Sequence, residues 1–208
     1  MPVRSPSGPC DMSGMDSSSQ PPVKRGEVSK ITDRILITDV WNAFDPEIIR
    51  NHRVTHVLSV MRHDDVPALA RAQLDSVSSS DEGFTELTRL TIPIADSQNT
   101  SLLDVLPQAL AFMDDALKEN AENILLVHCY AGISRSPSCV IAHLMDAMDI
   151  SMLAGYKRVR EARPGIRPNK NFLGQLREWG KSRQDRRNAS LASALPFSPS
   201  DDSGTSIL

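Results

Sequence analysis

Cys129 and Arg135 are the residues of this sequence whose types and spacing best suit a chemical step. They stand six positions apart in the segment HCYAGISRS, so one loop can bring both side chains to the same ligand. A cysteine becomes a nucleophile when a nearby cation and a helix N-terminus lower its thiol pKa from about 8.5. The planar guanidinium of an arginine can hold two phosphoryl oxygens at once. The pair therefore predicts attack by the Cys129 thiolate on a phosphate ester that Arg135 holds.

The loop between these two residues is expected to bind phosphate through its backbone. The apolar run at 124–127 predicts a buried strand before the loop, and a helix is predicted over 136–148 after it. Free N–H groups at a helix N-terminus, beyond the carboxyl end of a strand, form an anion site. Gly132 gives the loop the backbone freedom to curl its amides inward. The predicted phosphate-binding residues are Tyr130, Ala131, Gly132, Ile133, Ser134 and Arg135.

Two neighbours of the loop are expected to support the sulfur. We expect His128 to brace the loop without touching substrate, and Ser136 to donate a hydrogen bond that makes the sulfur a better leaving group. A plainer interpretation makes Cys129 a small buried apolar residue, as free cysteines often are. The combination of His128, Gly132 and Arg135 around it favours the catalytic interpretation.

Asp96 is the candidate general acid. It follows a predicted strand, within 87–94, in the polar segment DSQN, from which it could reach the phosphate loop. A carboxyl group can protonate the departing oxygen when nearby negative charge raises its pKa. A turn or N-cap residue is an equally good interpretation from position alone, because Asp96 also precedes a predicted helix.

The other two cysteines are given structural roles. Cys139 lies among apolar residues of the helix after the loop, so we expect it in the core, with redox pairing to Cys129 as the alternative. Cys10 lies in a Ser- and Pro-rich stretch and is expected to be inert. Three cysteines are too few for a disulfide scaffold, so a reducing compartment is the default.

Strand-like and helix-like segments alternate along the middle of the chain. Strands are predicted at 35–37, 56–60, 87–94 and 124–127, and helices at 102–120, 136–148, 151–161 and 170–182. The helix at 102–120 is expected to have Thr100 or Ser101 as its N-cap, and Asp45-Pro46 is expected to begin a short helix. The pattern predicts an α/β fold, with a central mixed, mostly parallel sheet flanked by helices. The polar stretch 64–83 is predicted to be a surface excursion between two strands.

Composition bounds the rest of the chain. The 208 residues are 40% hydrophobic with a net charge of −3, which suits one soluble domain and gives no overall polyanion-binding signature. We predict a catalytic domain over 27–187 between disordered tails at 1–26 and 188–208. Neither a secretory signal nor a run of about 18 apolar residues is present. Residues 157–187 carry 11 basic and 3 acidic groups, which could favour phosphorylated partners or simply be solvated helix faces.

The segment HCYAGISRS resembles the signature of the cysteine-dependent dual-specificity protein phosphatases. LTIPIADSQNTSLLDVLPQALAFMDDAL is similar to the acid loop and following helix of that family, and YKRVREARPGIRPNKNFLGQLREW to its closing helices. ITDRILITDV and VTHVLSV resemble its opening strands, so the likeness covers about 28–183. The resemblance implies that Cys129 is the nucleophile, Arg135 the phosphate-binding arginine and Asp96 the general acid, with no metal or other cofactor.

Details of the loop resemble the small atypical members of that family. Ser134 precedes Arg135 where tyrosine-specific and lipid phosphatases usually have Gly, and no Lys lies within the loop. The stretch 64–83 is longer than the usual connection, so the resemblance does not define the substrate-facing surface.

The expected substrate is a phosphorylated protein, such as a protein kinase. The chain is expected to be a monomer and to bind neither nucleic acid nor membrane. The expected location is the cytoplasm. The basic cluster 183–187 could also be a nuclear address, and the alternative is that it is a solvated helix end.

Two rival functions remain open at this point. The first is a degenerate phosphatase that only binds phosphoproteins; the presence of both Cys129 and Arg135 argues against it. The second keeps the chemistry but changes the substrate to RNA 5′-phosphate, glucan phosphate or inositol lipid. The chain lacks a loop lysine and an appended carbohydrate module, which favours phosphoprotein over these substrates.

Overall fold

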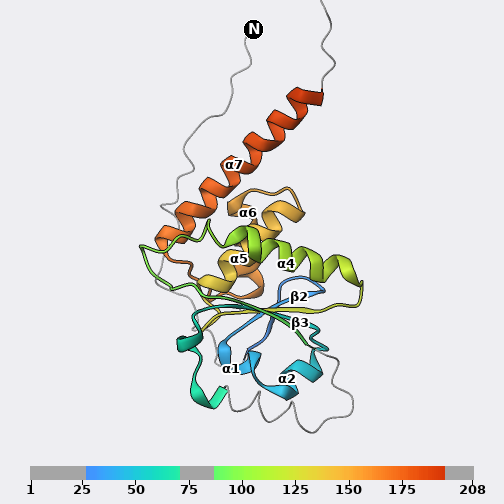
Figure 1. Ribbon diagram of the computed structural model, residues 1–208, viewed down its shortest axis with the longest axis vertical. Helices are drawn as coiled ribbons and strands as arrows, with labels where there is room; N and C mark the ends of the chain where they lie inside the picture. The colour runs from blue at the N-terminus through green and yellow to red at the C-terminus, as the bar shows by residue number, and fades with distance from the viewer. Residues whose placement is uncertain (1–26, 71–86, 195–208) are drawn as a thin grey trace, which may run out of the picture.

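A five-stranded sheet carries the loops that contain Cys129 and Asp96 (Figure 1). The computed structural model describes residues 27–70 and 87–194. The strands are β1 (Ser29–Lys30), β2 (Ile35–Thr38), β3 (His56–Val60), β4 (Thr88–Ile92) and β5 (Leu125–His128). Their order across the sheet is β1-β2-β5-β3-β4, and only the β1–β2 pair is antiparallel. The predicted mixed, mostly parallel sheet is confirmed.

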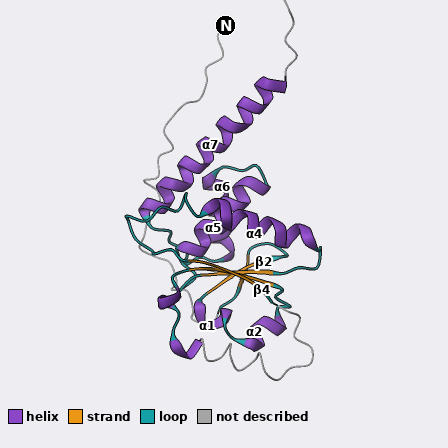
Figure 2. Ribbon diagram, viewed as in Figure 1, coloured by secondary structure: helices purple, strands orange, loops and turns teal. Residues whose placement is uncertain are grey.

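Helices cover both faces of the sheet (Figure 2). On one face lie the short helices α1 (Val40–Ala43) and α2 (Pro46–Asn51). On the other lie α4 (Leu106–Glu119), α5 (Arg135–Ala147), α6 (Met152–Ala162) and α7 (Lys170–Ala194). A single-turn 3-10 helix, η1 (His63–Asp65), follows β3. None of the helices in the described part of the chain is long and apolar enough to cross a lipid bilayer.

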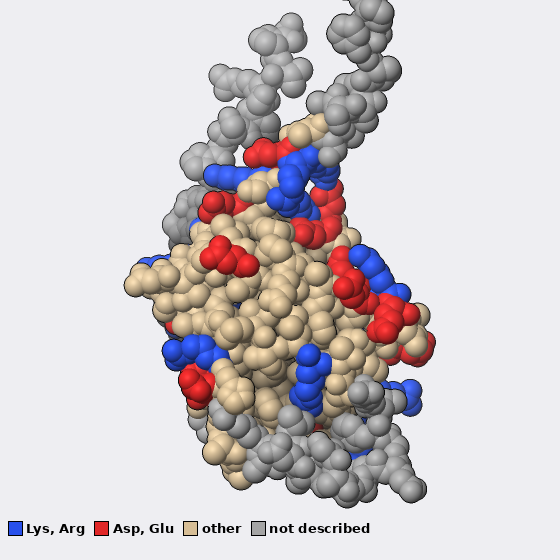
Figure 3. Space-filling view, in the orientation of Figure 1, with Lys and Arg blue, Asp and Glu red and all other residues tan. Residues whose placement is uncertain are grey.

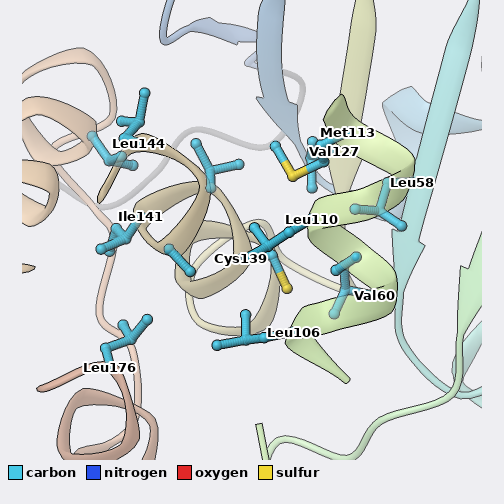
Figure 4. Close-up of a cluster of buried hydrophobic side chains, with 14 of the residues drawn as sticks. Leu58, Val60, Leu106, Leu110, Met113, Val127, Cys139, Ile141, Leu144 and Leu176 are labelled. Carbon is cyan, nitrogen blue, oxygen red and sulfur yellow. The ribbon is translucent and has the colours of Figure 1, made fainter. Parts of the chain in front are cut away.

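The larger hydrophobic core lies between the sheet and the helices α4, α5 and α7 (Figure 4). The central strand β5 is buried along its whole length, as its apolar run predicted. Leu106, Leu110 and Met113 recur on α4 at steps of four and three, so they lie on one face of the helix and pack in this core. Cys139 of α5 lies in the same cluster, fully buried, which confirms its predicted place in the core. This packing fixes β5 and α5, and therefore both ends of the phosphate loop.

Helix α4 begins four residues later than the predicted start at 102, and neither Thr100 nor Ser101 caps it. Pro107 explains the late start, because proline is tolerated in the first turn of a helix but not in its interior. The preceding N–H groups of Leu102 and Leu103 instead donate to the Gln175 side chain of α7, at 2.6 and 3.0 Å. By contrast, the predicted Asp45-Pro46 start of a helix is confirmed, since Asp45 accepts a hydrogen bond from the Glu47 N–H.

Helix α7 continues to Ala194, past the predicted end at 182 and past residue 187, where we placed the domain boundary. Its outer part projects from the body of the molecule (Figure 1). Arg183 and Arg187 of this part form ion pairs with Asp149, so acidic and basic side chains mix on the visible face (Figure 3). These two arginines of the basic stretch 157–187 therefore lie on an ion-paired helix face. The predicted tails at 1–26 and 195–208, with Cys10, and residues 71–83 of the excursion lie outside the described residues.

Candidate active site

The loop from Cys129 to Ser134 joins β5 to α5 at the carboxyl end of the central strand. Its glycine has the positive φ that this curled path requires, +66° at Gly132. A Cβ atom there would lie 2.5 Å from the Thr38 carbonyl oxygen and 2.8 Å from the Arg163 side chain. Gly132 is therefore required both for the backbone conformation and for close packing against its surroundings.

Every carbonyl group from Cys129 to Ser134 accepts a hydrogen bond from a donor outside this loop. The acceptor and donor pairs are Cys129 with His128 Nδ1 (3.3 Å), Tyr130 with the Val40 N–H (3.1 Å), Ala131 with Arg163 Nη2 (3.4 Å), Gly132 with Arg163 Nε (2.8 Å), Ile133 with the Arg167 N–H (2.8 Å), and Ser134 with the Ser138 N–H (3.1 Å) and Oγ (2.7 Å). A peptide unit points its N–H away from its C=O, so carbonyls held outward leave amides facing the interior of the loop. The loop is thus built as an anion-binding ring of N–H groups.

The sulfur of Cys129 lies within this ring. The residue is 2% exposed, and the Ser136 hydroxyl donates to Sγ at 3.3 Å, as the sequence predicted. Burial is the largest influence on the pKa of the Cys129 thiol and raises it. Hydrogen bonds from the Ser136 side chain and backbone act in the opposite direction, together with the Arg135 charge and the Ile133 N–H. The hydrogen bonds and the Arg135 charge outweigh burial, so the pKa of this thiol lies below its ordinary value, which favours the nucleophilic thiolate.

Arg135 begins α5, and its buried side chain is held from one end. Nη1 donates to the Asp65 carboxylate at 3.1 Å and to the Ile94 carbonyl at 3.2 Å. Nε is buried and has no hydrogen-bond partner among the described residues. The anchored end fixes the plane of the guanidinium, and Nε remains a donor that a phosphoryl oxygen could use.

Asp65 was not among the predicted site residues. It ends η1 and lies near the start of the stretch 64–83, which we predicted to be a surface excursion, and its side chain is only 22% exposed. The hydrogen bond from Arg62 and the bond and charge of Arg135 hold the pKa of the Asp65 carboxyl below its usual range, against the effect of burial. The sequence signal was available, because Asp65 closely follows the carboxyl end of β3, where ligand-binding loops of parallel sheets meet.

Asp96 lies against the phosphate loop, in the segment after β4. Its Oδ1 accepts hydrogen bonds from the Ser134 hydroxyl at 2.8 Å and from the Asn169 side chain at 2.7 Å. The backbone N–H of Asn169 in turn donates to the Ser134 hydroxyl at 3.1 Å. Asp96 is not the N-cap of α4, a position that Val105 occupies. The structure thus brings Asp96 to the site, and Asn169 is a contact that sequence reasoning missed.

Ser134 stands at the N-cap position of α5, but its hydroxyl makes no capping hydrogen bond to the helix. Instead the hydroxyl donates to Oδ1 of Asp96. The first N–H groups of α5 therefore keep their capacity for an anion, and the backbone of Ser136 is one of the groups that lower the pKa of the Cys129 thiol.

His128 lies under the loop as a neutral side chain. Burial lowers the pKa of its imidazole to about 4. The Cys129 carbonyl can only accept, so Nδ1 is the donor of that 3.3 Å bond, and Nε2 accepts from the Ser59 hydroxyl at 2.6 Å. The ring also packs edge-on to Phe44. These contacts place His128 as a brace between β3 and the loop.

Comparisons with known sequences agree on one kind of domain. The family model described as dual specificity phosphatase, catalytic domain, matches residues 37–182. Dual specificity protein phosphatase 19 of Mus musculus is 31% identical over 153 residues, which are 74% of this chain and 62% of that protein. Dual specificity protein phosphatase 16 of Homo sapiens is 42% identical over 101 residues, which are 49% of this chain and 15% of that protein. The chain therefore spans less than two thirds of either relative.

Solved structures share the fold. The phosphatase domain of Yvh1 from Chaetomium thermophilum has a TM-score of 0.62 and 29% identity, over 76% of this chain and 98% of that one. Human DUSP28 gives a TM-score of 0.63 and 24% identity, over 79% of this chain and 97% of that one. The human tyrosine phosphatase-like serine/threonine/tyrosine-interacting protein gives a TM-score of 0.63 and 24% identity, over 77% of this chain and 99% of that one. The last two likenesses show a common fold.

Proposed function

Because the chain belongs to the dual-specificity phosphatase family, we propose that it hydrolyses phosphotyrosine and phosphoserine or phosphothreonine monoesters of proteins through a cysteinyl-phosphate intermediate. The observation that carries the proposal is the loop whose carbonyls are all held outward around the Cys129 sulfur. Such a ring binds a tetrahedral dianion and places it against a thiolate, which is the arrangement that phosphoryl transfer to sulfur requires.

In the first step, the Cys129 thiolate attacks phosphorus in line with the leaving oxygen. The S–P bond forms as the P–O ester bond breaks, and Asp96 gives its proton to the departing alkoxide or phenoxide. Loop amides and the Arg135 guanidinium hold the equatorial oxygens, where negative charge accumulates in the transition state. The carbonyl contacts that fix these amides exist before substrate arrives, so little reorganisation is needed.

In the second step, water hydrolyses the cysteinyl phosphate. The Asp96 carboxylate removes a proton from water, whose oxygen attacks phosphorus as the S–P bond breaks. The thiolate leaves with the Ser136 hydroxyl 3.3 Å from Sγ, which stabilises the charge it recovers. Asp96 is thus an acid in one step and a base in the next, and the Ser134 and Asn169 contacts hold it in place for both.

Two features of the loop support phosphoproteins as substrates. Ser134 precedes Arg135, and no lysine lies between Cys129 and Arg135 to add the charge that an inositol phosphate headgroup favours. The fold alone does not choose between catalysis and binding, since a protein whose name describes interaction shares it. The choice here depends on the presence of Cys129, Arg135 and Asp96 in one site.

The test compares substrates with the purified chain. Phosphotyrosine and phosphothreonine peptides, an RNA 5′-phosphate, a glucan phosphate and an inositol phospholipid are supplied at equal concentration, and released phosphate is measured. We expect both peptides to be hydrolysed faster than the other three substrates. Faster release from a non-protein substrate would overturn the substrate class, and release from none of the five would leave a binding module.

A further inference from the structure

Arg163, just after α6, is a buried cation that lies behind the phosphate loop. The residue is 1% exposed, and it is the largest fully buried side chain in the described part of the chain. Its Nε donates to the Gly132 carbonyl at 2.8 Å, and its Nη2 donates to the Ala131 carbonyl at 3.4 Å. One guanidinium therefore holds two consecutive carbonyls of the ring. A buried charge is costly unless its donors are satisfied, so this placement is tightly specified.

The contact at Gly132 leads directly to the nucleophile. The Gly132 carbonyl and the Ile133 N–H belong to the same planar peptide unit and point in opposite directions. Arg163 holds the carbonyl from outside, so the Ile133 N–H faces the inside of the loop, where it is one of the groups that lower the pKa of the Cys129 thiol. A shift of the guanidinium would rotate this peptide and turn a donor away from the thiolate.

We propose that Arg163 is a positioning residue that keeps the Cys129 sulfur ionised by orienting the Gly132–Ile133 peptide. The inference rests on the proposed function and adds to it a residue that touches neither the substrate nor the sulfur. Lysine cannot replace the arginine, because a single ammonium lacks the planar fork that reaches the two loop carbonyls and further acceptors at fixed angles.

The third arm of the guanidinium is anchored at the start of the described chain. Nη1 donates to the Glu27 carbonyl at 3.1 Å and to the Ser29 hydroxyl of β1 at 3.0 Å. The Thr38 hydroxyl donates to the same Glu27 carbonyl at 3.2 Å. The edge strand β1 is thus part of the support of the phosphate loop, although it lies two strands away from β5 in the sheet.

Arg34 offers a matched control at a different part of the molecule. Its Nη1 also donates to backbone carbonyls, those of Leu117, Asn120 and Ala121, at 2.8, 3.1 and 3.4 Å. These carbonyls lie at the C-terminal end of α4 and do not belong to the phosphate loop. An Arg34→Lys variant loses the same kind of contact without touching the ring.

The test measures the ionisation of Cys129 in Arg163→Lys, Arg163→Met and Arg34→Lys. The rate of iodoacetamide alkylation at Cys129 is followed by mass spectrometry across pH, in samples shown to be folded by thermal unfolding. We expect the midpoint to rise by about one pH unit in both Arg163 variants and to stay at the wild-type value in Arg34→Lys. Hydrolysis of an aryl phosphate should fall about 100-fold in kcat/KM in the Arg163 variants, with weaker inhibition by vanadate.

An unchanged alkylation midpoint in a folded Arg163→Lys would overturn this inference, as would an equal rise in Arg34→Lys. Neither result depends on turnover, so the proposed phosphatase function could stand while the inference fails. Conversely, a wild-type chain without hydrolysis but with the expected midpoint shift would reject the function alone. If neither Arg163 variant folds, Ser29→Ala replaces them, because it removes only one acceptor of the guanidinium. A smaller rise in the Cys129 midpoint then supports the inference, and no rise rejects it.

Discussion

Cys129 and Cys139 are two buried thiols ten residues apart whose environments have opposite effects. Cys129 is 2% exposed and Cys139 is fully buried, so water reaches neither freely. Yet the pKa of the Cys129 thiol is held below its ordinary value, whereas burial, reinforced by the nearby Cys129 charge, raises the pKa of Cys139 to about 12. The difference lies in the hydrogen-bond donors that surround each sulfur.

Helix position determines which donors are available. Cys139 is inside α5, where backbone N–H groups bond to carbonyls one turn earlier, and its neighbours are apolar side chains of the core (Figure 4). Cys129 precedes α5, where the first N–H groups have no partner within the helix. The N-cap residue Ser134 leaves them uncapped, and Arg135 adds a positive charge. Burial alone therefore makes an inert thiol, and burial among oriented donors makes a nucleophile.

The largest effect is expected from Cys129→Ser. The substituted hydroxyl has a similar shape, but it does not ionise near neutral pH, so hydrolysis of an aryl phosphate should fall by about 10⁴-fold or more. Steady-state kinetics and thermal unfolding of the same sample measure the loss and show that the fold persists. Turnover within tenfold of wild type would remove the nucleophile from Cys129 and end the comparison.

Asp96→Asn should have the next largest effect, and the effect should depend on the leaving group. An amide accepts the Ser134 hydrogen bond but cannot supply a proton, so hydrolysis of a phosphothreonine peptide should fall about 100-fold. For p-nitrophenyl phosphate, whose leaving group needs little protonation, the loss in the first step should be much smaller. Burst kinetics separate the two steps, and an equal loss of the first step for both substrates would show that Asp96 is not the acid.

Ser136→Ala sharpens the comparison by deleting one donor from the Cys129 sulfur. The hydroxyl stabilises the thiolate, so its loss should raise the pKa of Cys129 and slow breakdown of the cysteinyl phosphate by about tenfold. Rapid-quench detection of the phosphorylated protein should show that the intermediate accumulates. Unchanged breakdown together with an unchanged thiol pKa would assign no role to this hydrogen bond.

Cys139→Ala is the reciprocal substitution and should have the smallest effect on catalysis. Removing a buried sulfur from the core should cost about 1 kcal/mol of unfolding free energy, and kcat/KM should stay within about twofold of wild type. Chemical denaturation and steady-state kinetics give the two quantities. A large loss of turnover at unchanged stability would show that Cys139 takes part in the chemistry.

The strand, loop and helix around Cys129 could be predicted because their signals are local. A four-residue apolar run, a glycine and an arginine six residues after the cysteine place each group relative to the next along the chain. Asp96 was found in the same way, from the strand end before it. The predicted start of α4 was wrong, although Pro107 was a signal for the correct one. Proline fits the first turn of a helix better than its interior.

Asn169 and Arg163 could not be found by the same reasoning, whereas the position of Asp65 shortly after β3 was a signal that went unused. All three side chains reach groups distant in sequence: Asp65 lies 70 positions from Arg135, Asn169 lies 73 from Asp96, and Arg163 lies 31 from Gly132. Such single contacts leave no periodic pattern and depend on how the sheet brings strand ends together. Spacing along the chain indicates the chemistry of this site, while Asn169 and Arg163, which help to hold it in shape, become visible only in the folded structure.

The most direct test follows the alkylation of both thiols in one sample of the folded wild-type chain as pH is raised. Iodoacetamide labelling resolved by mass spectrometry should give a Cys129 midpoint below the value of about 8.5 for a free thiol. Vanadate should block this labelling, and Cys139 should react only after denaturant is added. A Cys129 midpoint at or above that of a free thiol, or equal labelling of the two cysteines in the folded protein, would contradict the account.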